Sequence, residues 1–280
     1  MNSKIGIHLS YWQNSWRDPL LPLIEKASQT GFGVAEFPLL FPNELPYDRL
    51  REELERLEMA ASCGTGLGPE TDITHLDPRI QQAGLNHLFA CLQGAAQLGS
   101  PVLGGLTYAP WGVFPEDDLK QRQETCILSL KLAVQKAEEV GVNICLEVVN
   151  RFEGYLINTV QQGLEIIREV NSNNIFLHLD TFHLNIEADQ IDQEILAAGK
   201  HLGHFHCVAN NRKPPGQGHI PWKEVRQALK EINYQGYLVA ETFVNPQGEV
   251  GRGMFIHRSL AEDLDDSARE TAEFLGQQLL

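Results

Sequence analysis

The feature that most constrains the fold of this chain is a regular alternation of strand-like and helix-like segments, repeated about eight times along its length. The strand-like segments are short apolar runs, which are typical of parallel strands buried on both faces of a sheet. We expect them at about residues 5–10, 33–38, 59–66, 101–107, 143–149, 175–181, 202–208 and 236–243. Such an alternation predicts an α/β fold, and its length favours a (β/α)8 TIM barrel.

The segments between the strands carry helix start and stop signals. Asp18 followed by Pro19 predicts the first helix, which we expect to end near Gly31. A longer helix is expected from about residue 115 to residue 140, with Gly141 as its C-terminal stop. Others are expected at about residues 48–58, 78–98, 159–170, 190–202, 222–232 and 267–277. No repeat or low-complexity linker interrupts this order, so we expect residues 1–280 to form a single domain.

The composition of the chain is compatible with one large hydrophobic core. The chain has 280 residues, 42% of them hydrophobic, which is enough to bury a sizeable interior. It contains no apolar run of about 18 residues, so no membrane span is expected. The N-terminal residues lack the basic head, apolar core and cleavage site of a secretory signal. The five cysteines are an odd number without paired spacing, which favours reduced thiols and a cytoplasmic protein.

The net charge of −15 argues against a polyphosphate partner. Arg212 and Lys213 form an isolated basic pair and not a stripe, so nucleic acid is not an expected partner. The glycines at residues 64–68 (GTGLG) lack the lysine of a phosphate-binding loop, and no convincing helix follows them. We expect a flexible loop at the barrel mouth there. The overall charge does not argue against binding of a neutral small molecule.

Four of the later strand-like segments end on a side chain that binds metals. These are ICLE at Glu147, LHLD at Asp180, GHFH at His206 and LVAE at Glu241. Active-site groups of barrels lie at the C-terminal ends of the strands, and these four strands are consecutive neighbours. Any one residue alone could equally be a helix cap or an ion-pair partner, but the joint pattern is hard to obtain by chance. Oxygen-rich ligation with one imidazole predicts a single divalent ion, Mn²⁺, Mg²⁺ or Co²⁺.

Longer motifs resemble a known superfamily over nearly the whole chain. They are GIHLSYW (6–12), LEVVNRFEGYLINT (146–159), LDTFHLNIEA (179–188), GHFHCVANNRKPPGQGHIPW (203–222), AETFV (240–244) and VGRGMFIHRSLAED (250–263). The sequence resembles the xylose-isomerase-like TIM-barrel superfamily of sugar isomerases and epimerases. Within it, the chain is most similar to the ketose 3-epimerases, typified by D-tagatose 3-epimerase and D-psicose (allulose) 3-epimerase. The resemblance implies metal-dependent epimerisation of small free ketoses at C3, with Mn²⁺ as the first choice of metal, and a homodimer or homotetramer.

The resemblance also implies roles for individual residues. The positions that match the family's metal ligands are Glu147, Asp180, His206 and Glu241, and those that match its substrate-binding residues are Glu153, His183 and Arg212. Epimerisation at C3 removes a proton next to a carbonyl, and a divalent ion on the C2 and C3 oxygens stabilises the resulting cis-enediolate. Two glutamates on opposite faces of that intermediate can exchange the proton, and Glu147 and Glu241 are the candidates.

Other residues are weaker candidates for the site. His8, Trp12 and Trp111 are expected near strand ends, where they would line the sugar pocket or simply pack at its rim. Glu36 is a carboxylate on a buried strand, so it either supports the site through a hydrogen bond or forms an ion pair in the barrel wall. His204 shares the inward face of its strand with His206, and we do not expect it to be a ligand.

Two departures from the family pattern concern substrate preference. The family often has His-x-Gly-Glu-x-Asn-Arg after strand seven, whereas this chain has Cys207, Val208, Ala209, Asn210 and Asn211 between His206 and Arg212. It also has Thr242 where the family often has proline. Three alternative functions therefore stay open: an aldose–ketose or hydroxypyruvate-type isomerase of the same superfamily, an abasic-site endonuclease, and a non-catalytic sugar-binding or regulatory barrel. The acidic charge disfavours the endonuclease.

Overall fold

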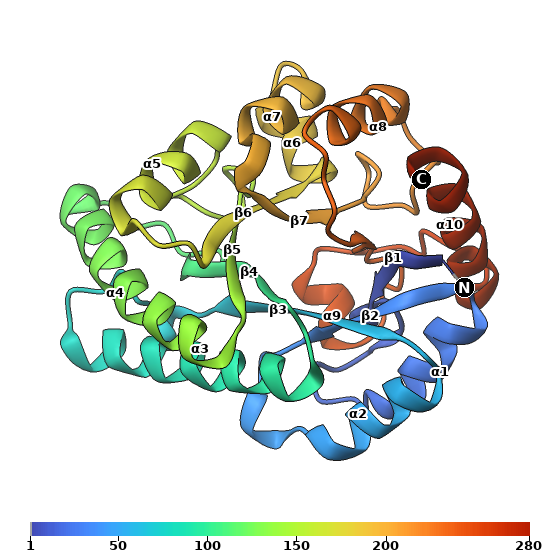
Figure 1. Cartoon of the computed structure of the whole chain (residues 1–280), viewed down its shortest axis with the longest axis horizontal. Coiled ribbons are helices and arrows are strands. Elements are labelled where there is room, and N and C mark those ends of the chain that lie inside the picture. The colour runs from blue at the N-terminus through green and yellow to red at the C-terminus, as the bar shows by residue number, and fades with distance from the viewer. Residues whose placement is uncertain (1) are drawn as a thin grey trace.

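Eight strands, each parallel to its neighbours, close into a barrel surrounded by helices in the computed structural model, which describes residues 2–280 (Figure 1). The strands are β1 (Asn2–His8), β2 (Phe32–Pro38), β3 (Ala60–Leu67), β4 (Val102–Pro110), β5 (Asn143–Glu147), β6 (Ile175–Asp180), β7 (Leu202–His206) and β8 (Leu238–Ala240). Each strand pairs with the next along the chain, and β1 pairs with β8. The predicted (β/α)8 barrel is confirmed.

Most helices lie outside the strands, whereas α9 (Gly248–Gly253) lies over the barrel opening in the view of Figure 1, where its Gly253 lines the cavity. They are α1 (Leu21–Gln29), α2 (Tyr47–Arg56), α3 (Pro78–Leu98), α4 (Leu119–Val140), α5 (Val160–Val170), α6 (Thr181–Glu187), α7 (Ile191–Ala198), α8 (Trp222–Glu231), α9 (Gly248–Gly253) and α10 (Leu264–Leu279). Helix α4 stops as predicted at Gly141, whose φ of 73° is the left-handed conformation that glycine adopts without strain. Helix α5 begins with a capping box between Thr159 and Gln162.

Some predicted boundaries were wrong. Asp18 does not cap the first helix; its carboxylate accepts hydrogen bonds from the backbone N–H groups of Asn14 and Ser15 at 2.7 and 2.9 Å. Helix α1 begins three residues later, at Leu21. The start of α4 is Leu119 and not residue 115. The strand expected at residues 59–66 is β3, which extends to Leu67, so the flexible loop expected at residues 64–68 is wrong for residues 64–67.

The strand ends bring distant parts of the sequence to one edge of the barrel. Strands β5, β6 and β7 end on Glu147, Asp180 and His206, and β8 ends one residue before Glu241. The register pairs Asp180 directly with His206, so these two tips are neighbours. The shortness of β8, compared with the expected 236–243, leaves Glu241 just beyond the last ladder position.

Away from this edge, apolar side chains form most of the interior. All five cysteines are buried and free, so no disulfide forms among them. Ring-sized side chains such as Tyr108, Phe37 and Phe205 are fully buried between the strands and helices. In the part of the chain that the structure describes, no helix is both long enough and apolar enough to cross a membrane.

Candidate metal centre and active site

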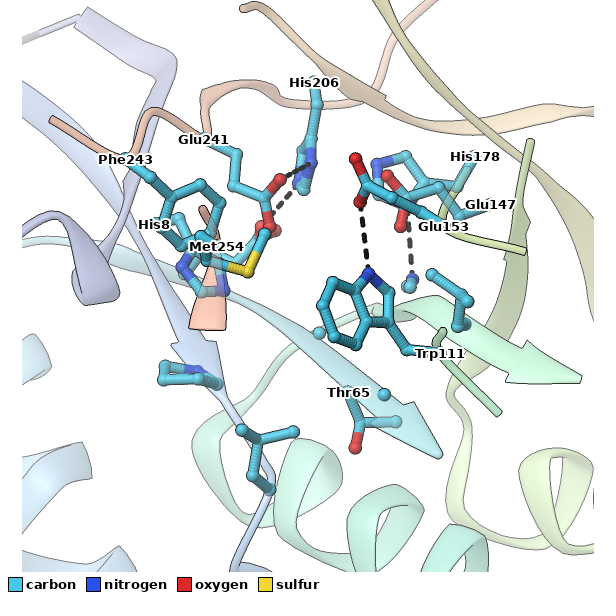
Figure 2. A pocket seen from close by; sticks show the side chains of 18 of the residues that line it. His8, Thr65, Trp111, Glu147, Glu153, His178, His206, Glu241, Phe243 and Met254 are labelled. Atoms are coloured by element: carbon cyan, nitrogen blue, oxygen red, sulfur yellow. Dashed lines mark hydrogen bonds and ion pairs between the residues drawn. The ribbon is translucent and has the colours of Figure 1, made fainter. Parts of the chain in front are cut away.

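A cavity of about 300 Å³ opens at the C-terminal ends of the strands. Residues at or near the C-terminal ends of the strands contribute to its wall, from His8, the last residue of β1, to Glu241 after β8. One side of the wall is charged and the other is mainly glycine and apolar side chains. Figure 2 shows the cavity with Glu241, His206 and Glu147 together at its upper edge. This is the edge at which barrels carry their active sites.

The four predicted ligands meet in this cavity. One ligand atom from each of Glu147, Asp180, His206 and Glu241 lies within 4.8 Å of those of the other three. His206 Nδ1 is 3.5 Å from Glu241 Oε2 and 4.0 Å from Asp180 Oδ2. Asp180 Oδ1 accepts the backbone N–H of Phe182 at 2.7 Å and so caps α6, which leaves Oδ2 for another partner.

The donor atoms of this group fit a cation. Glu147 Oε1, Asp180 Oδ2 and His206 Nδ1 are all buried without a hydrogen-bond partner. Leaving buried polar atoms unpaired is unfavourable, by roughly 1–3 kcal/mol for a neutral group and more for a charged one. A divalent ion within reach of all three would satisfy them together, and the oxygen-rich donor set suits Mn²⁺, Mg²⁺ or Co²⁺.

The carboxyl groups of the centre have very different pKa values. Burial raises the pKa of Glu147 well above its usual range, and the charge of Glu241 adds to the effect. Burial also raises the pKa of Asp180, to about 7, although Arg212 and His206 oppose it. For Glu241, the effect of burial is outweighed by the proximity of His206, whose Nδ1 lies 3.5 Å from Oε2, and the pKa falls to about 2. Without a cation, the site therefore does not hold all three carboxylates in the charged form.

Arg212 lies beside the ligands. Its Nη2 donates to both carboxylate oxygens of Glu153 at 3.1 and 3.2 Å, and its guanidinium stacks 3.8 Å above the Phe182 ring. Its Nη1 is 3.7 Å from Glu241 Oε2 and 4.0 Å from Asp180 Oδ2, and it is buried without a hydrogen-bond partner. One guanidinium nitrogen is thus fixed by the protein, while the other faces the cavity with hydrogens to donate.

His183 faces the same centre from α6. Its Nδ1 lies within hydrogen-bond distance of two N–H donors of Asn150, the side-chain amide at 2.7 Å and the backbone at 3.2 Å. Burial lowers the pKa of His183 to about 4, so the ring is neutral near pH 7. Because Nδ1 accepts, the proton is on Nε2, which lies 3.6 Å from Glu147 Oε1. His183 therefore presents an N–H donor to the cavity.

Of the weaker candidates, four line the cavity (His8, Trp111, Glu36 and His204) and Trp12 does not. Trp111 donates its Nε1–H to Glu153 Oε2 at 3.1 Å, and His8 lines the opposite wall with its Nδ1 2.5 Å from Ser10 Oγ. Trp12 is absent from the cavity: its indole N–H donates to Asp265 on α10 at 2.7 Å. Of the two interpretations of Trp12, packing holds and pocket lining does not, because a 3₁₀ turn (Leu9–Trp12) follows His8 and breaks the strand alternation.

Sequence reasoning missed several apolar residues of the wall, among them Trp16, Phe243 and Met254. Phe243 was detectable, because it lies two residues beyond Glu241 and residues two apart in extended chain share a face. Trp16 and Met254 lie in loops, where no periodicity marks them. Figure 2 shows Phe243 and Met254 next to Glu241.

The comparisons with known proteins agree with this architecture. The family described as Xylose isomerase-like TIM barrel matches residues 24–277. D-psicose 3-epimerase of Ruminiclostridium cellulolyticum is 35% identical over 268 residues, covering 94% of this chain and 92% of that protein. L-ribulose 3-epimerase of Methylomonas sp. is 32% identical, with 98% and 96% covered.

Solved structures match over nearly the full length. The D-psicose 3-epimerase of Clostridium cellulolyticum H10, solved with D-tagatose, superposes with a TM-score of 0.94 at 34% identity, and 99% of each chain is covered. The match over almost all of the barrel, together with relatives above 30% identity, shows that the chain belongs to the xylose isomerase-like TIM barrel family.

Proposed function

We propose that this protein is a metal-dependent ketose 3-epimerase that acts on small free ketoses. The observation that carries the proposal is the gathering of Glu147, Asp180, His206 and Glu241 around one point of a sugar-sized cavity. The names of the relatives support it, because those at 30% identity or above are D-psicose and L-ribulose 3-epimerases.

The four residues Glu147, Asp180, His206 and Glu241 would hold one divalent ion, with Mn²⁺ as our first choice and Mg²⁺ or Co²⁺ as alternatives. When bound, the ion would supply a Lewis acid that makes the proton at C3 of a ketose more acidic.

Glu147 and Glu241 are proposed to move the proton. They come from β5 and β8, and Figure 2 shows them on opposite sides of His206. A flat substrate between them would have one carboxylate near each face. One glutamate would remove the C3 proton and the other would return a proton to the opposite face, which inverts the carbon. Which glutamate acts as the base depends on the direction of the reaction.

Donors in the cavity would hold the oxygens of the substrate. Arg212 Nη1 and His183 Nε2 both face the cavity with hydrogens that the protein does not use in hydrogen bonds. Their N–H groups can stabilise negative charge that develops on oxygen during proton removal. Glu153 would orient Arg212, and Trp111 and His8 would border the sugar.

The test is a product and isotope assay. The protein is incubated with Mn²⁺ and D-fructose, D-psicose, D-tagatose or L-ribulose in deuterated water, and the sugars are separated and examined by NMR. We expect the C3 epimer with deuterium at C3. Deuterium at C1 with an aldose product would instead indicate an aldose–ketose isomerase, and binding without turnover of any sugar would indicate a non-catalytic barrel. Either result overturns the proposal.

The remaining expectations are part of the same proposal. We propose that residues 1–280 act as one domain in a homodimer or homotetramer, in line with the family resemblance. The five buried free thiols support a cytoplasmic location, and neither nucleic acid nor a membrane is an expected partner. Light scattering coupled to size-exclusion chromatography measures the oligomeric state directly.

A further inference from the structure

One buried carboxylate near the site is not among the four ligands. Glu36 is on β2, on the other side of the barrel from β7, and its exposed fraction is 0%. Its Oε1 lies 2.6 Å from His206 Nε2 in hydrogen-bond geometry. Its Oε2 lies 2.6 Å from His204 Nε2, but this second approach is oblique and is a close electrostatic contact, not an aligned hydrogen bond.

These contacts determine where the imidazole protons are. A carboxylate oxygen and an unprotonated ring nitrogen would repel each other at 2.6 Å, so the Nε2 atom of His206 carries a hydrogen. An imidazole that ligates an ion is neutral and has only one N–H, so in that state the lone pair is on Nδ1. That atom lies 3.5 Å from Glu241 Oε2 and 4.0 Å from Asp180 Oδ2, and it is the nitrogen that faces the other ligands.

We propose that Glu36 is a positioning residue for the metal centre: it holds the proton of His206 on Nε2 and the ring in place, so that Nδ1 is the nitrogen available to the ion. This inference rests on the metal-binding part of the proposed function. Carboxylate partners of ligating histidines act in this way in many metal sites, and their loss lowers metal affinity by roughly 10- to 100-fold.

The surroundings of Glu36 support a positioning role. His204 contacts the second oxygen of Glu36, and the His204 ring packs edge-on against His178 and His206 with centroid separations of 4.7 and 5.0 Å. Gly104 leaves room for this stack, because a Cβ there would lie 3.1 Å from His178 Nδ1 and 3.3 Å from His204 Cδ2. The rings are therefore held tightly, and so is the direction of His206 Nδ1.

The three histidines His178, His204 and His206 are themselves close enough to be considered as metal ligands. The contacts of Glu36 argue against that use, because they engage the Nε2 atoms of both His204 and His206. The only nitrogen of His206 left over is Nδ1, which belongs to the four-residue centre. We therefore infer that these three histidines and Glu36 support the site of the one proposed ion and do not bind a second ion.

The inference is tested with Glu36→Gln, which preserves shape and removes the charge. Mn²⁺ binding to the wild type and the variant is measured by isothermal titration calorimetry. We expect the dissociation constant of the variant to rise roughly 10- to 100-fold. The matched control is Asp72→Asn, another buried carboxylate, which contacts Thr74 and Arg122 and none of the ligands. Its Mn²⁺ affinity should equal that of the wild type.

A second measurement does not depend on the variant folding. In the Mg²⁺-loaded wild type, ¹⁵N-detected NMR of labelled histidines should show a slowly exchanging hydrogen on Nε2 of His206 and none on Nδ1. A proton on Nδ1 overturns the inference, and so does unchanged Mn²⁺ affinity in Glu36→Gln. Failure of the wild type to bind Mn²⁺, Mg²⁺ or Co²⁺ at all would instead refute the proposed function itself.

Discussion

The two halves of the barrel mouth differ sharply in chemistry. Strands β5 to β8 contribute the four candidate ligands, each at or next to a strand end. Strands β1 to β4 contribute mainly space, with glycines at positions 64, 66, 104 and 105 in the cavity wall. One half thus concentrates charge that needs a cation, and the other leaves room for a ligand. Substitutions in the first half should therefore impair the chemistry, whereas most of those in the second should alter which sugar fits. Glu36 on β2 is the exception, because it contacts His206.

The largest expected effect comes from removing one of the two proposed proton carriers in the charged half. Glu241→Gln keeps the shape of the side chain but cannot exchange a proton, so kcat should fall by about 10³-fold. Initial rates of C3 epimer formation measure the effect, and circular dichroism melting confirms that the variant is folded. Retention of a tenth of the wild-type rate would exclude Glu241 from proton transfer.

The next largest effect concerns Arg212. Arg212→Lys retains the charge but replaces a two-pronged donor with a single ammonium group, so it cannot contact both Glu153 and the substrate in the same way. Loss of a charged hydrogen bond of about 1.5–3 kcal/mol should lower kcat/KM roughly 10- to 100-fold.

Arg151→Lys is the matched control for this substitution. Arg151 is an exposed arginine that forms an ion pair with the largely buried Glu187 in the same region of the barrel, so the same chemical change there should leave kcat/KM unchanged. Equal losses in both variants would show that the effect at Arg212 is not specific to the site.

A smaller effect is expected in the glycine-lined half. A Cβ at Gly66 would have no atom within 4 Å, so Gly66→Val should fold and place its methyl groups in the cavity. KM for the preferred ketose should rise about tenfold, since one misplaced methyl group in a pocket changes binding by roughly 1–3 kcal/mol. Gly66→Ala should give an intermediate KM. A parallel loss of Mn²⁺ affinity would contradict the division between the two halves.

Trp111 follows β4 and contacts Glu153, which lies beyond β5, so it connects the two halves. We expect its substitution to have a modest effect on KM. Its indole donates to Glu153 and stacks on Phe255 with a centroid separation of 5.8 Å. Trp111→Phe keeps an aromatic ring on Phe255 but removes the N–H donor, a loss of about 1 kcal/mol that should raise KM about fivefold. Steady-state kinetics with unchanged kcat would support this role, whereas a large fall in kcat would place Trp111 in the chemical step.

The buried cysteines of both halves of the barrel should be equally unreactive. All five cysteines are buried, and burial raises the pKa of Cys91 to about 12 and that of Cys207 well above its usual range. Thiolates are the reactive form, so none should react with Ellman's reagent in the native protein, and all five should react after denaturation. Rapid modification of any of them in the native state would reveal an opening between strands and helices.

The barrel and the four candidate ligands could be predicted from the sequence for a simple reason. Each of the later strands is an apolar run that stops at a side chain able to bind a metal, as at Asp180 and His206. The prediction that a helix starts at Asp18 was wrong, because a carboxylate can cap a local turn as readily as a helix. The partner of Glu36 was also beyond prediction. Strand periodicity indicates which face a residue occupies but not that His206 lies across the barrel from it.

Helix α6 illustrates another limit. We expected Asp180 at a strand end but not that its carboxylate would also begin a helix that carries His183 toward Glu147. A segment of seven residues is too short for a helical period to be evident. Tertiary contacts, such as those of His183 with Asn150, determine its orientation, and these involve residues far apart in sequence.

The pairing of β1 with β8 has a consequence for how the protein is made. Ile5 pairs with Leu238 and Ile7 with Ala240, so the cylinder closes only when the two ends of the chain meet. Pairings between such distant residues form late in folding, because long loops must close first. Glu241 follows directly on β8, so the complete ligand set exists only in the closed cylinder. Uptake of the ion and the last step of refolding should therefore coincide, and the concentration of free metal should set how long the finished protein survives heating.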